Sequence, residues 1–300
     1  MGSPRGFLIL VIASAALLVL PDIALAWGPA THVKIARDIL SELQALSPAL
    51  AALLARFARD FLFGNIAADV VFAKRLARIK QHCHQWSTAF EILDSAPTES
   101  GRAFACGYLA HLAADTVAHG KFLPRQVTLT GTTLSFGHIY WEMRADSAIG
   151  THYWEQLRQI LAHRYDQHET LLAQQLTQSV LPFRWNRAIF YRINRTVSRR
   201  GWIRTADAWY DRSRWELPDD ILAEYRRESV DRAIDVLVSG RRSPVTHMDP
   251  NGTIALGHAR IRRRQNRRMA RAGILHPHVL AEAVARHAPR RGRPDYPLAG

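Results

Sequence analysis

Cysteine is scarce in this sequence, which contains only Cys83 and Cys106. Two cysteines form at most one disulfide, which excludes a small fold held together by several of them. An exported protein can oxidise such a pair, but the sequence does not show that the two thiols meet. Two ordinary buried cysteines are the default interpretation, and a metal-binding role stays open for Cys83 because histidines flank it.

Alternation of apolar and polar residues, the pattern of half-buried strands, is also lacking, and no internal repeat is present. Apolar residues recur at helical spacing instead, and proline and glycine divide the chain into helix-length segments. We therefore expect an all-α fold. Outside the helices we expect a basic connector at 70–80, a polar loop or extended segment at 122–135 and a loose C-terminal tail. The predicted helices are His32–Leu46, Pro48–Phe63 (ending at Gly64-Asn65), one from about Trp86 to Asp94, Gly101–His119, Thr151–Val180, Arg184–Arg199, Asp219–Ser239, Leu256–Arg271 and Val279–His287.

Lysine is absent after Lys121, yet the chain carries a formal net charge of +14 at pH 7. Residues 27–180 are nearly neutral, with 14 Lys+Arg against 13 Asp+Glu. Residues 181–300 carry 25 Arg against 12 Asp+Glu, so almost the whole excess lies in this part. Such a basic region favours anionic partners, namely a phospholipid surface or nucleic acid. An Arg-rich surface that is merely solvated is the alternative.

Long apolar runs are confined to the N-terminus, where Phe7–Leu20 follows the basic residue Arg5 and precedes the A-x-A pattern at Ala24–Ala26. These are the three parts of a cleavable secretory signal peptide. We predict that the protein is exported, to the periplasm or the medium, and that the mature chain begins at Trp27. An uncleaved membrane anchor is the alternative, although Pro21 interrupts the apolar run well short of the length that a span needs.

The richest chemical pattern lies in Gly107–His119, where His111, Asp115 and His119 follow one another at four-residue intervals. On an α-helix these positions share one face. The residues between them are small or apolar, which predicts a buried helix, and buried imidazoles and carboxylates are costly unless they bind something. Neutral imidazole and carboxylate are ligands of zinc. A metal site is one interpretation, and a hydrogen-bonded polar stripe between helices is the other.

Other residues upstream and downstream fit the same chemistry. His138 and Glu142 are one helical turn apart and share a face. Asp69 follows a predicted turn in apolar surroundings. His82 and His84 do not share a helical face, so at most one of them is expected to join a helix-borne site. The eight histidines from residue 152 onward show no such spacing and are expected to be surface or core residues.

Taken together, these residues resemble the zinc-dependent phospholipases C and the related tri-zinc single-strand nucleases. The shared pattern is an N-terminal Trp, a nearby His, an Asp after a Gly-containing turn and a His beside an aromatic residue. It continues with H-x-x-x-D followed by another His, and ends with H-x-x-x-[ED]. Over residues 27–150 the matching positions are Trp27, His32, Asp69, His82 or His84, His111, Asp115, His119, His138 and Glu142.

The resemblance implies up to three Zn²⁺ ions in a cleft between helices. It implies that the free amino nitrogen and carbonyl oxygen of Trp27 chelate one zinc, with His32 beside it, which requires removal of the signal peptide. Of the two candidate histidines, His84 is favoured because Trp86 lies beside it. The short spacing from Asp115 to the next histidine departs from the secreted phospholipases.

The resemblance also assigns roles to the acids. Asp115 would bridge two zincs, and His111, Asp69 and a histidine of the 82–84 pair would hold one of them. Such a cluster activates water and binds phosphate oxygens. Asp69 is the candidate catalytic residue that orients or deprotonates the attacking water. The remaining coordination would fall to His119, His138 and Glu142.

The expected architecture is a signal peptide at 1–26, a phospholipase C-like helical domain at 27–180 and an Arg-rich helical extension at 181–300. The expected function is hydrolysis of phospholipid phosphodiesters, with C-type or D-type cleavage. A nuclease with the same metals and a non-catalytic, zinc-stabilised module are the alternatives. If the protein is a phospholipase or a membrane-binding module, the Arg-rich part is expected to contact the membrane surface.

Overall fold

The structure is a computed structural model, and it describes residues 27–70, 83–130, 134–176, 182–199, 201, 203–204, 215 and 217–274. Outside the described residues lie the predicted signal peptide, most of the basic connector at 70–80, His82, the predicted helix Val279–His287 and the C-terminal tail.

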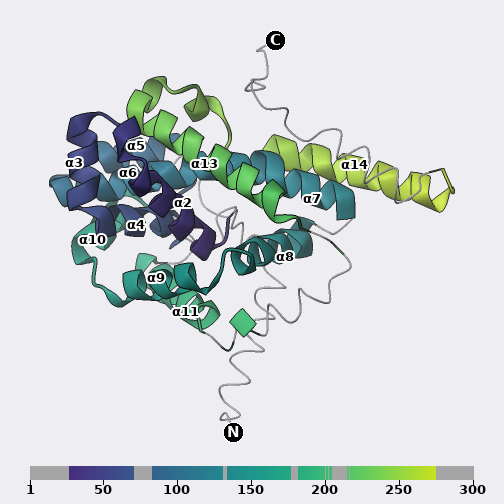
Figure 1. Cartoon of the computed structure of the whole chain (residues 1–300), viewed down its shortest axis with the longest axis horizontal. Helices are drawn as coiled ribbons and strands as arrows, with labels where there is room; N and C mark the ends of the chain where they lie inside the picture. The colour runs from purple at the N-terminus through teal and green to yellow at the C-terminus, as the bar shows by residue number, and fades with distance from the viewer. Residues whose placement is uncertain are drawn as a thin grey trace, which may run out of the picture.

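The described residues form helices joined by turns, with no strand among them, which confirms the all-α prediction (Figure 1). Within this part of the chain no helix is both long and apolar enough to cross a bilayer. The short elements are η1 (Leu43–Ala45), η2 (Ala68–Val70), η6 (Gly240–Arg242), η7 (Pro244–His247) and the π-helix η5 (Ala118–Phe122). The α-helices are α2 (Pro29–Ser41), α3 (Pro48–Arg56), α4 (Ala58–Ala67), α5 (Trp86–Asp94), α6 (Glu99–Val117), α7 (Leu123–Thr130), α8 (Leu134–Ser147), α9 (Thr151–Ala162), α10 (Asp166–Gln175), α11 (Phe183–Val197), α13 (Asp219–Ser239) and α14 (Thr253–Arg271).

Helix α6 is the centre of the fold, and every residue from Ala103 to Val117 is buried. Helices α4, α13 and α5 pack against it. A helix that is covered on all sides cannot keep a charged outer face, so its polar residues must find partners in the interior. The predicted site residues of this helix therefore lie in the driest part of the molecule.

Two glycines bring the backbones of α4 and α6 into direct contact. A Cβ on Gly64 would lie 2.0 Å from the carbonyl oxygen of Phe104, and one on Gly107 would lie 2.0 Å from that of Phe61. No side chain fits at either position without moving a helix. The prediction that a helix ends at Gly64-Asn65 is wrong for this reason: the glycine serves helix packing, and α4 continues to Ala67.

Other expected boundaries also need correction. The predicted helix Pro48–Phe63 is two helices, α3 and α4, which meet at Phe57. The predicted helix Thr151–Val180 is also two, α9 and α10, with a break at residues 163–165. The segment 122–135 was expected to be a loop because of its threonines, but Leu123–Thr130 is α7. There, burial of Leu123 and Val127 outweighs the low helix propensity of threonine.

The first described helix is held at its N-terminus by an acid from another helix. Asp146 of α8 accepts hydrogen bonds from the backbone nitrogens of Ala30 (3.1 Å) and Thr31 (2.8 Å) and from the Thr31 hydroxyl (2.6 Å). A carboxylate at a helix N-terminus satisfies amides that lack partners within the helix. Burial raises the pKa of Asp146 to about 6, although the bonds from Thr31 and Ala30 favour its ionised form. This contact fixes the position of α2, which carries His32.

The Arg-rich part packs against the core through α13, which lies along α6. The guanidinium of Arg232 donates to the Thr116 hydroxyl at 2.8 Å, and the indole of Trp27 donates to the Ser229 hydroxyl at 3.1 Å. Helices on both sides of residue 180 thus share one hydrophobic core. The division of the chain into domains at that residue stays a prediction.

The contact between α4 and α6 gives a stability prediction. Replacing Gly107 with Ala forces the two backbones apart, so the free energy of unfolding should fall by about 1–3 kcal/mol or more. The control is Gly257→Ala on α14, where an added Cβ meets nothing within 4 Å. In urea unfolding that variant should match the parent or gain about 0.5–1 kcal/mol. Equal midpoints for the two variants would contradict the close packing.

Candidate metal centre

The carboxylate of Asp115 is the centre of a buried group of imidazoles. It lies on α6, is 0 % exposed, and faces the Nε2 atoms of four histidines in the described part of the chain. Its Oδ2 is 3.0 Å from His84, 3.2 Å from His111 and 3.9 Å from His119, and its Oδ1 is 3.3 Å from His32. Segments that are up to 87 residues apart in sequence therefore place donor atoms around one acid.

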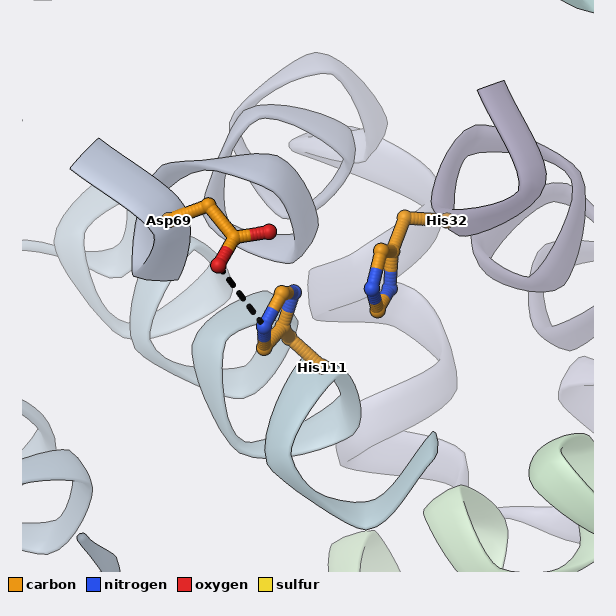
Figure 2. A group of neighbouring side chains, drawn as sticks. All are labelled: His32, Asp69 and His111. Carbon is orange, nitrogen blue, oxygen red and sulfur yellow. Dashed lines mark ion pairs between the residues drawn. The ribbon is translucent and has the colours of Figure 1, made fainter. Parts of the chain in front are cut away.

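A second acid joins the group from η2. Oδ1 of Asp69 lies 3.3 Å from Nε2 of His84 and 4.0 Å from Nε2 of His111. Figure 2 shows the ring of His111 between Asp69 on one side and His32 on the other. The rings of His32 and His111 stack with centroids 4.0 Å apart. Two overlapping sets of three donors are arranged closely enough to share a metal ion: His32, Asp69 and His111, and His84, His111 and Asp115.

The tautomer of His111 indicates which kind of ligand the cluster favours. Its Nδ1 lies 2.8 Å from the backbone carbonyl oxygen of Asn65, which only accepts, so Nδ1 carries the proton. In the neutral ring, Nε2 then presents a lone pair to the carboxylate of Asp115. Burial, followed by the charge of His32, lowers the pKa of His111 and opposes a second proton. A lone pair that faces a carboxylate in a dry interior favours a cation between them.

The state of Asp115 supports the same interpretation. Burial raises the pKa of this carboxyl, but its contacts with His111, His32 and His84 outweigh burial and hold the pKa well below its usual range. The group is therefore an anion. Neither of its oxygens has a hydrogen bond of ordinary geometry within the described residues. A buried anion without such bonds is costly unless a positive charge is bound beside it.

The cluster continues along the π-helix η5 to α8. His119 lies in η5, and its ring meets that of His138 edge-on with centroids 5.0 Å apart. Nε2 of His138 is 2.8 Å from Oε1 of Glu142, one turn along α8. Both Glu142 and His119 are buried. A π-turn inside a helix often marks a functional site, and here it carries the last histidine of the α6 series.

The donor set and its spacing fit zinc. Ligands about 2.0 Å from a tetrahedral zinc lie roughly 3.3 Å apart, and imidazole nitrogen and carboxylate oxygen are among its usual ligands. The Nε2 atoms of His84 and His111 are 3.1 Å apart, and their distances to Oδ2 of Asp115 are 3.0 and 3.2 Å. The cluster is therefore compatible with metal binding in both chemistry and dimensions.

A family model described as zinc-dependent phospholipase C matches residues 31–194, more than half of the chain. The chain belongs to this family. No curated protein and no solved structure matches it. Membership in the zinc-dependent phospholipase C family supports a hydrolase activity, and it agrees with the resemblance drawn from the sequence. Zinc is the metal that the family and the donor set have in common.

Trp27 and His82 were also predicted to be metal ligands. Trp27 lies outside the matched segment, and its indole is buried against Phe122, with ring centroids 4.8 Å apart. Its side chain anchors the start of the described chain, and a role for its amino nitrogen as a ligand stays a prediction. His82 lies outside the described residues, whereas His84 is in the cluster.

Several residues that position the cluster were not predicted from the sequence. Asn65 uses its side-chain oxygen to contact Nδ1 of His32 at 3.2 Å and its backbone oxygen to contact His111. The amide of Asn251 donates to the carbonyl oxygen of His84 at 3.0 Å. Gly252, at φ +59°, lies so close to His119 that a Cβ would be 2.3 Å from that residue's carbonyl oxygen. The Pro-Asn-Gly turn was a visible signal, but nothing in the sequence links it to His84.

The two contacts of Asn65 allow a selective test. Asn65→Ala removes the side-chain oxygen that orients His32 and keeps the backbone oxygen that orients His111. The affinity for zinc should fall by about 10–100-fold, as for other outer partners of metal-binding histidines. Asn194→Ala, at a buried asparagine on α11 that bonds the Phe190 carbonyl, is the control and should bind zinc as the parent does. Equal affinities for the two variants in a competition titration would contradict the role of Asn65.

Proposed function

We propose that this protein hydrolyses the phosphodiester bond of phospholipids with C-type or D-type cleavage, using a zinc-activated water. The observation that carries the proposal is the buried anion Asp115 with four imidazole nitrogens within 4 Å, inside a segment that matches the zinc-dependent phospholipase C family. A purely structural polar network would be expected to satisfy its acid with hydrogen bonds. Among the described residues, the oxygens of this acid face imidazole nitrogens without hydrogen bonds of ordinary geometry, an arrangement that supports a bound cation.

We propose that the cluster holds up to three zinc ions. Asp115 is the bridging ligand, because its two oxygens face different histidines, with His32 at Oδ1 and His84 and His111 at Oδ2. Asp69 supports the ion on the side of His84. The remaining ligands are His119, His138 and Glu142, with the amino nitrogen and carbonyl oxygen of Trp27.

In the proposed reaction, different residues of the chain would bind the metal, accept a proton and hold the ligands in position. Bound zinc would lower the pKa of a water molecule and neutralise charge on the phosphate oxygens. Asp69 is the proposed proton acceptor for that water, because it lies at the edge of the cluster and retains slight exposure, 6 %, where Asp115 has none. Asn65 orients the imidazoles of His32 and His111, and Asn251 holds the backbone of His84. Helices α4 and α13 pack on α6, which carries His111 and Asp115, and both of these residues are fully buried.

We also propose that the protein is exported through the predicted signal peptide and that Trp27 becomes the first residue of the mature chain. A free amino group at that position is required for it to bind a metal, because the nitrogen of a peptide bond does not. The burial of Trp27 beside Phe122 of η5, the π-helix that carries His119, supports this placement.

The bridging role of Asp115 is tested by counting metal ions. Asp115→Asn keeps the shape of the side chain and removes its charge, so the purified protein should lose more than one zinc per chain. The control is His168→Gln, at a buried histidine that pairs with Asp60 at 2.6 Å, away from the cluster. That variant should keep the metal content of the parent. Loss of one ion or none from Asp115→Asn would refute the bridge.

The reaction itself is tested with phosphatidylcholine vesicles, a soluble phosphodiester and single-stranded DNA. Phospholipid turnover should require zinc, and Asp69→Asn should lower kcat by about 10²–10⁴-fold, as expected for loss of a general base. The acidic limb of the pH–rate profile should disappear in that variant, and His168→Gln should leave both unchanged. Rapid DNA cleavage without lipid turnover would overturn the proposal in favour of a nuclease. Bound zinc with no turnover of any substrate would favour a non-catalytic module.

A further inference from the structure

Helix α14 combines high positive charge with a largely exposed surface. It carries seven arginines and no acidic residue between Thr253 and Arg271. One of them, Arg263, is partly buried. The other six are exposed: Arg260, Arg262, Arg264, Arg267, Arg268 and Arg271. In Figure 1 the second half of the helix extends beyond the rest of the folded helices at one side of the molecule.

Apolar residues form a line along the outer face of the same helix. Ile254 is 71 % exposed, Ile261 53 % and Met269 39 %. Ile254 and Ile261 are seven residues apart and lie nearly in line at 3.6 residues per turn, and Met269, eight residues further on, lies about 80° around the helix from Ile261, so the three side chains share one broad face. Ala259, on the other side, is buried where α14 packs on α7. The exposed apolar line is therefore not the face that packs on α7 in the described part of the chain.

The arginines of α14 differ from those of α13 in their partners. On and after α13, Arg227 pairs with Glu42, Arg232 with Glu228 and Arg241 with Asp94. For the six exposed arginines of α14, the described part of the chain supplies no ion pair. Burial and the charges of Arg267 and Arg264 lower the pKa of Arg263, a sign of crowding among like charges. A cationic face of this kind favours anionic partners.

We propose that α14 lies on the surface of an anionic phospholipid membrane, with Ile254, Ile261 and Met269 inserted at the level of the head groups. At about 100° per residue, Arg264 and Arg268 flank the apolar line on one side and Arg262 on the other. This is the pattern of an interfacial amphipathic helix. Nucleic acid is the weaker partner, because α14 has no aromatic side chain for stacking and its apolar line would gain nothing there.

The N-terminus of α14 lies beside the candidate metal centre. The carboxylate of Asp249 accepts hydrogen bonds from the backbone nitrogens of Thr253 at 2.7 Å and Asn251 at 2.8 Å, which caps the helix. In the same turn, Asn251 bonds the carbonyl oxygen of His84, and Gly252 contacts His119. A membrane-bound α14 therefore holds the cluster close to the lipid surface. This consequence rests on the proposed function, whereas binding of α14 to lipid does not.

The test is flotation of the zinc-loaded protein with vesicles of phosphatidylcholine, with and without phosphatidylglycerol. Arg262→Gln/Arg264→Gln/Arg268→Gln should lower partition into anionic vesicles by at least about tenfold. The matched control removes two exposed arginines from α11 and one that follows it closely, as Arg184→Gln/Arg192→Gln/Arg199→Gln. Those charges lie elsewhere on the protein, so partition should change by about twofold at most at physiological salt. Equal losses for the two triple variants would show an effect of net charge alone and overturn the proposal.

A second variant separates lipid from nucleic acid. Ile254→Ser/Ile261→Ser should weaken vesicle binding and leave binding to a single-stranded oligonucleotide unchanged. Unchanged vesicle binding would overturn membrane insertion, and tighter binding to the oligonucleotide than to vesicles would favour nucleic acid.

A soluble short-chain phosphodiester distinguishes this proposal from the proposed function. The α14 variants should hydrolyse that substrate as the parent does. Vesicle binding by a parent protein without hydrolytic activity would leave the lipid surface in place and refute the enzyme. Hydrolysis of vesicle lipid that is insensitive to the α14 variants would refute the lipid surface and leave the enzyme.

Discussion

The arrangement of the site depends on the burial of one ionised carboxylate, that of Asp115. Asp115 lies in the last turn of the central buried helix, where an anion without a partner would be strongly destabilising. The protein supplies imidazoles from four other positions, and at least one of them, His111, presents a lone pair and not a proton. Imidazoles in that tautomer do not neutralise an acid. They and the acid together are arranged to bind a cation, and a bound cation would offset the cost of burying both.

The packing of the helices holds these side chains in position. Gly64 and Gly107 allow α4 to approach α6, which brings Asn65 within reach of two histidines. Asp146 fixes the start of α2 and with it His32. These contacts come from helices that are distant in sequence. The site thus depends on packing that can be disturbed without changing any ligand.

Much of this was predictable from the sequence because ligands on one helix keep a fixed spacing. The interval of four residues placed His111, Asp115 and His119 on one face, and His138 and Glu142 on another. The supporting residues were not predictable, since Asn65 follows a glycine that resembles a helix terminus, and the use of that glycine depends on α6. The threonines after Lys121 suggested a loop for a similar reason: local propensity was outweighed by burial that only the tertiary structure supplies.

The central claim is that the buried cluster is a zinc site, and diffraction from zinc-loaded crystals at the zinc absorption edge tests it most directly. The account predicts anomalous density about 2.0–2.2 Å from both Nε2 of His111 and a carboxylate oxygen of Asp115. Density confined to exposed histidines, with an empty or water-filled cluster in the same crystals, would contradict it.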